Sequence, residues 1–83
     1  MNSDLKIAQA YLSELGFIEN PLAPNNWIKR DSLVIFQFDV RIPSYLLLWS
    51  NIDDDNPQDV FWLNNDIDVR AFIRNQIKEA HEL

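Results

Sequence analysis

The chain lacks several residue types that common functional sites require. Its 83 residues include no cysteine, a single histidine (His81) and a single glycine (Gly16). The absence of cysteine excludes disulfides, thiolate metal ligands and cysteine nucleophiles. One histidine excludes a multi-histidine zinc or iron site, and one glycine excludes a glycine-rich phosphate-binding loop. We therefore expect no cofactor and no bound metal.

Long apolar runs are missing as well. The longest, Tyr45 to Trp49, is five residues, far shorter than the roughly 20 that a membrane-spanning helix needs. The first residues, Met1 to Leu5, have neither the basic start nor the apolar stretch of a secretory signal. These features predict one small domain over residues 1–83 that is soluble, cytoplasmic and not bound to a membrane.

The N-terminal segment has the pattern of an amphipathic helix. Ser3 is placed to cap its start, and Gly16 is placed to end it in a left-handed conformation, with Phe17 folding back on the last turn. The apolar residues recur at helical spacing and are Leu5, Ala8, Leu12 and Leu15.

The middle of the chain is typical of β-structure. We predict strands at Trp27–Arg30, Leu33–Val40 and Tyr45–Trp49. Val60–Leu63 fits either a fourth strand or the approach to the last helix, because four residues carry too little periodicity to decide. Alternation within the second strand places four apolar residues on one face, namely Val34, Phe36, Phe38 and Val40.

The C-terminal segment predicts a second helix. Asn65 is a candidate N-cap, with Asp66 and Asp68 in the first turn. The buried stripe consists of Val69, Phe72, Ile73, Ile77 and Ala80. The predicted fold class is therefore α+β: a helix, a three- or four-stranded antiparallel sheet and a helix, with both helices on one face of the sheet.

The negative charge is concentrated in one segment. No basic residue occurs between Arg41 and Arg70, and outside that segment seven acidic residues balance seven basic ones. The net charge of −6 therefore equals the charge of the six aspartates within it: Asp53, Asp54, Asp55, Asp59, Asp66 and Asp68. Such a cluster is typical either of a solvated acidic loop that aids solubility or of a docking surface for a basic partner.

A calcium loop is a third reading, since Asp53-x-Asp55 begins like an EF-hand. That motif requires a further ligand where this chain has Pro57, a glycine where it has Gln58, and a bidentate glutamate where it has Asn64. Three mismatches argue against it, so we predict no metal site.

Nucleic-acid binding is also disfavoured. The predicted order of elements matches that of the double-stranded RNA-binding domain, but binding of this kind needs lysine and arginine to neutralise phosphates. The chain carries a net charge of −6. We therefore expect no direct contact with nucleic acid.

Catalysis is not expected either. His81 lies two residues from the C-terminus, where chains commonly fray, and is a poor candidate for a general base. No serine lies in a Gly-x-Ser-x-Gly context. The sequence therefore favours a protein that is not an enzyme.

Three aromatic residues are candidates for contact with a partner. Two helices cover one face of such a sheet and leave the other to water or to another protein. Tyr45 and Trp49 lie in a strand that is apolar on both faces, and Trp62 follows in the next apolar segment. Tryptophan and tyrosine often carry the binding energy of protein interfaces.

These observations favour a non-catalytic, acidic protein-binding module whose partner has a basic surface. We expect it to inhibit or antagonise a nucleic-acid-handling enzyme by occupying its basic groove, as small phage or mobile-element inhibitors such as anti-CRISPR proteins do. An acidic effector chaperone or a toxin-immunity protein is one alternative. A homodimeric structural protein with no foreign ligand is another.

Overall fold

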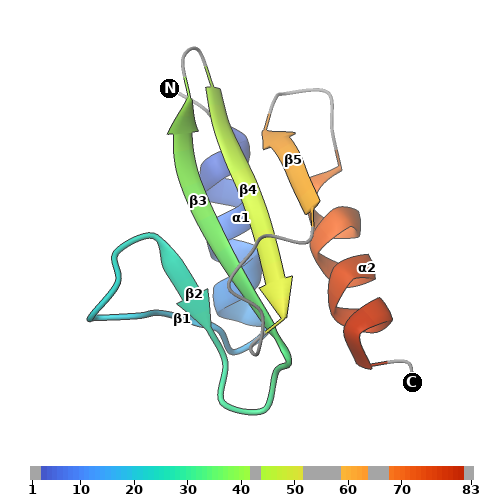
Figure 1. Ribbon diagram of the computed structural model, residues 1–83. Helices are drawn as coiled ribbons and strands as arrows, with labels where there is room; N and C mark the ends of the chain where they lie inside the picture. The colour runs from blue at the N-terminus through green and yellow to red at the C-terminus, as the bar shows by residue number, and fades with distance from the viewer. Residues whose placement is uncertain (1–2, 42–43, 52–58, 64–67, 82–83) are drawn as a thin grey trace.

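A computed structural model shows an α+β fold with a five-stranded antiparallel sheet and two helices (Figure 1). It describes residues 3–41, 44–51, 59–63 and 68–81. The elements are α1 (Ser3–Glu14), β1 (Ile18–Glu19), β2 (Asn26–Ile28), β3 (Val34–Arg41), β4 (Ser44–Asn51), β5 (Asp59–Leu63) and α2 (Val69–His81). The predicted fold class and the order of helix, sheet and helix are confirmed, but the predicted count of three or four strands is too low.

The additional strand is β1. It contains two residues, Ile18 and Glu19, which pair with Ile28 and Trp27 of β2. A two-residue strand carries no measurable alternation, so the sequence pattern gave no sign of it. The open alternative at Val60–Leu63 is resolved as a strand, since β5 pairs with β4 along its whole length.

The end of α1 follows the prediction closely. Gly16 has a φ angle of 96°, and the N–H of Phe17 donates to the carbonyl oxygen of Leu12 at 2.9 Å. This bond spans five residues and satisfies a carbonyl that the helix leaves unpaired. Phe17 is only 2% exposed, so the cap also delivers a ring to the core.

Each strand pairs with the next, which gives the spatial order β1-β2-β3-β4-β5. The register of β3 and β4 places Phe36 opposite Trp49 and Phe38 opposite Leu47. Phe36, Phe38 and Leu47 are buried. Val40 shares their face by alternation but is 61% exposed, since it lies at the hairpin end of β3 and outside the core cluster.

One hydrophobic core joins both helices to one face of the sheet. Phe17 meets Phe36 edge to face with ring centres 5.6 Å apart, and Phe61 of β5 stacks on Phe72 of α2 at 4.1 Å. The buried members are Ala8, Leu12, Phe17, Val34, Phe36, Phe38, Leu47, Leu63, Val69 and Ile73. Both helices therefore cover the same face, and the opposite face of the sheet is left without a helix.

The second helix begins later than expected. The Asp68 carboxylate oxygen Oδ1 accepts the backbone N–H of Ala71 at 3.1 Å, so Asp68 occupies the N-cap position rather than the first turn. Asn65, the predicted cap, lies outside the described residues. Neither α1 nor α2, as described, is long and apolar enough to cross a membrane.

Candidate functional site

The face of the sheet that carries no helix has an unusual number of apolar side chains. Side chains alternate between the two faces along each strand, so a residue that follows or precedes a core-facing residue lies on the outer face. Six of them form what we call the diagonal band: Ile18, Ile28, Ile35, Leu46, Leu48 and Trp62. The band draws one or two residues from each of the five strands.

The strand register explains why these residues form a continuous band. Ile18 pairs with Ile28 across β1 and β2, and Leu46 pairs with Trp62 across β4 and β5. Between these pairs, Ile35 is diagonal to Leu48, since Gln37 is the direct partner of Leu48. Diagonal neighbours in a sheet remain within reach of long side chains.

Exposure along the band is high at its two ends. Ile18 is 61% exposed and Trp62 is 47% exposed, whereas Leu46 is 7% exposed. Ile28, Ile35 and Leu48 are half-buried. Alternation places polar residues beside the band on the same face, namely Asn26, Gln37, Asp39 and Ser50. An apolar centre beside polar neighbours is the usual composition of a protein–protein interface.

This outer face departs from the common pattern for a sheet with one covered face. Such sheets normally alternate between apolar residues facing the core and polar residues facing water. Here β4 is apolar on both faces, with Leu47 in the core and Leu46 and Leu48 outside it. Leu46 is already buried, whereas Ile18 and Trp62 remain largely exposed, so the two ends of the band are the parts whose placement favours contact with another molecule.

The structure separates the three aromatic residues predicted to bind a partner. Trp62 belongs to the diagonal band, but Trp49 and Tyr45 lie on the helix-facing side, opposite Phe36 and Leu63 respectively. Both rings are half-buried and pack against the core. The sequence pattern does not tell which face of β4 a side chain lies on, because both faces are apolar.

Sequence reasoning did not identify Ile18 and Ile28 as members of the outer face, because the strands that hold them are too short to show alternation.

The structure describes only part of the predicted acidic patch. Asp53, Asp54, Asp55 and Asp66 lie outside the described residues. Asp59 begins β5, where its backbone is opposite Trp49. Asp68 is exposed, and its carboxylate is engaged in capping α2.

The band presents apolar surface rather than reactive groups. Its six side chains supply no acid, base or nucleophile. Among the described residues, no three side chains of histidine, aspartate or glutamate come together in a group that could hold a metal ion. A comparison of the chain with models of protein families, with curated proteins and with solved structures finds no match.

Proposed function

We propose that this chain is a non-catalytic protein-binding module that docks through the outer face of its sheet. The observation that carries the proposal is the diagonal band, an apolar surface that extends across all five strands and is not covered by either helix. Burying apolar surface gives about 25 cal/mol per Å². Trp62, at 47% exposed, is the aromatic side chain of the band, and tryptophan is among the residues most often found to carry interface binding energy.

The partner in this proposal is a nucleic-acid-handling enzyme with a basic groove, which the module inhibits in the cytoplasm. The net charge of −6 supports a basic partner, since complementary charge accelerates and orients association. Asp39, which pairs with Leu46 on the outer face, places a carboxylate beside the band. The aspartates of the 53–68 segment are the proposed source of the remaining charge.

The experiment is capture of partners by matched variants. Wild-type protein, Trp62→Ala and Val40→Ala are immobilised and exposed to an extract of the cells that make the protein, and the bound proteins are quantified by mass spectrometry. Val40 is a matched control, because it is an exposed apolar strand residue at 61% but lies on the other face of the sheet. We expect a basic protein that wild type and Val40→Ala retain and Trp62→Ala loses. Equal retention by all three would refute docking through the band.

The role of charge is tested separately with Asp53, Asp54 and Asp55 changed together to Asn. We expect slower association with the captured partner, and a weaker dependence of the association rate on ionic strength, because screening acts on exposed charges. An unchanged rate in a folded variant would remove acidic steering from the proposal. Sedimentation of wild type alone as a tight dimer that Trp62→Ala dissociates would assign the band to self-association instead.

A further inference from the structure

A pocket of about 320 Å³ is lined by residues that lie outside the diagonal band and that the proposed function does not use. Its apolar wall is formed by Leu15, Phe17 and Ile77, and polar groups come from Lys29, Asp31 and His81. The pocket thus joins the end of α1, the turn between β2 and β3, and the last turn of α2. Its volume is at the small end of the roughly 300–1,000 Å³ found for small-molecule sites.

Gly16 gives the Lys29 side chain room to reach this pocket. A Cβ atom at Gly16 would lie 3.3 Å from Cε of Lys29 and 3.8 Å from its Nζ. The lysine stem therefore crosses the glycine that ends α1, and its side chain is only 37% exposed. An ammonium beside apolar walls is a suitable partner for an anion that carries an apolar body, because the charge-assisted hydrogen bond adds to the burial of apolar surface.

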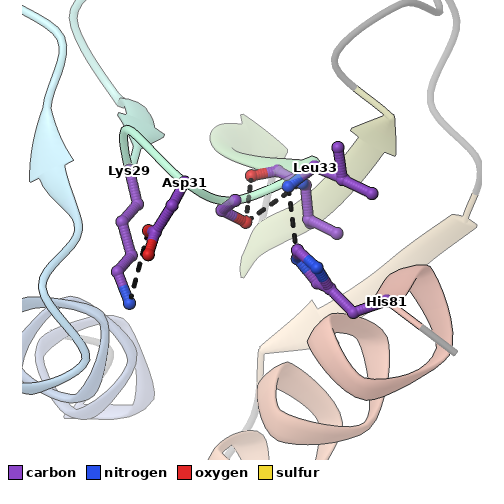
Figure 2. Close-up of polar contacts among 6 residues, drawn as sticks. Lys29, Asp31, Leu33 and His81 are labelled. Carbon is purple, nitrogen blue, oxygen red and sulfur yellow. Dashed lines mark hydrogen bonds and ion pairs between the residues drawn. The ribbon is translucent and has the colours of Figure 1, made fainter.

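His81 completes the pocket from α2. Figure 2 shows its ring directed at the turn that carries Leu33, with Lys29 and Asp31 farther along the same turn. The N–H of Leu33 donates to Nε2 of His81 at 3.3 Å, which holds the ring against this turn. The sequence predicted a frayed end here, but this contact joins the last turn of α2 to the turn that precedes β3.

The turn itself is fixed by internal hydrogen bonds. The backbone N–H of Ser32 donates to the carbonyl oxygen of Lys29 at 3.1 Å, and the Ser32 hydroxyl oxygen accepts the N–H of Val34 at 3.1 Å. Ser32 is 7% exposed. Because the backbone of this turn is already fixed, a ligand binds beside it at a lower entropic cost than beside a turn that must first be ordered.

We propose that this pocket binds small organic carboxylates with an apolar body. The carboxylate accepts hydrogen bonds from the Lys29 ammonium, the His81 ring lines the same pocket, and the apolar body packs on Leu15, Phe17 and Ile77. Asp31 does not block this arrangement. Its carboxylate is 3.8 Å from Nζ of Lys29 and its side chain is 81% exposed, so the pair is longer than a direct hydrogen bond and leaves the ammonium with donors to offer.

The test uses sodium hexanoate as the probe and two-dimensional amide NMR as the readout. Hexylamine has the same number of carbon atoms with the opposite charge, and acetate has the same charge without the long alkyl chain. We expect hexanoate to shift the amide signals of Phe17, Ser32 and Leu33 saturably, with a dissociation constant of about 1 mM, a realistic value for so small a ligand. Hexylamine and acetate are expected to bind at least about tenfold more weakly.

Two lysine variants assign the carboxylate contact. Lys29→Met keeps the stem but removes the charge, and we expect it to weaken hexanoate binding by about tenfold or more. Lys6→Met is the matched control, because Lys6 is an exposed lysine of α1 that does not line the pocket, and it should bind like wild type. Three results would each overturn the proposal. The first is equal binding of hexanoate by Lys29→Met and wild type, and the second is equal binding of hexylamine and hexanoate by wild type. The third is the absence of saturable shifts.

Discussion

Replacing Gly16 with alanine tests the local account of how α1 ends. The φ angle of 96° at this residue lies in the left-handed region, where a side chain costs roughly 1–2 kcal/mol. The new Cβ would also approach Cε of Lys29 to 3.3 Å, a contact that a flexible lysine stem relieves by a shift of a few tenths of an ångström. Most of the cost is therefore expected from the backbone.

We expect Gly16→Ala to lower the free energy of unfolding by about 1–2 kcal/mol. In a domain of this size, each kcal/mol corresponds to a decrease in Tm of roughly 4–8 °C. Urea denaturation followed by tryptophan fluorescence measures the change. Gly16→Asn is the informative comparison, because asparagine adopts left-handed conformations more readily than alanine and should lose less stability. Stability equal to wild type in Gly16→Ala would refute the left-handed cap.

Three further predictions concern helix α2 and strand β5. Asp68→Ala should lower the free energy of unfolding by about 1 kcal/mol through loss of the cap on α2, while Asp68→Asn should retain most of it; equal urea midpoints would contradict the cap. A double-mutant cycle on Phe61→Leu and Phe72→Leu should give a coupling energy of about 0.5–1.5 kcal/mol from the stacked rings, and additive losses would show that the rings are independent. Trp62→Ala should lower the free energy of unfolding by about 1–2 kcal/mol, since the side chain is 47% exposed and lies outside the core cluster; a loss of about 3–5 kcal/mol, the range of a core tryptophan, in thermal denaturation would assign Trp62 a structural role.

The sequence predicted well those parts of the fold that show long, regular hydrophobic patterns. The alternation around Phe36 and Phe38 identified the core face of β3, and the helical spacing up to Leu15 located α1 with its glycine cap. The start of α2 was misplaced, because Asn65, Asp66 and Asp68 are all good capping residues within four positions. The hydrogen bond from the N–H of Ala71 identifies Asp68 as the cap.

The candidate sites were harder to predict, because they depend on strand register and on contacts between distant segments. Tyr45 and Trp49 differ from Leu46 and Leu48 only by the face of β4 on which they lie, and a strand that is apolar on both faces leaves that choice open. The pocket at the end of α1 brings together Leu15, Lys29 and His81. These residues are far apart in the sequence, and no spacing pattern connects them. In both cases the sequence pattern does not tell which residues the tertiary fold brings together.

The central claim is that the diagonal band is the binding surface, and calorimetric titration of the captured partner tests it most directly. A tryptophan that carries the binding energy of an interface contributes about 2 kcal/mol or more, which is roughly 30-fold in Kd. We expect Trp62→Ala to weaken binding by that factor and Val40→Ala to bind like wild type. A Kd for Trp62→Ala within about twofold of wild type, a difference below 0.5 kcal/mol, would contradict the claim.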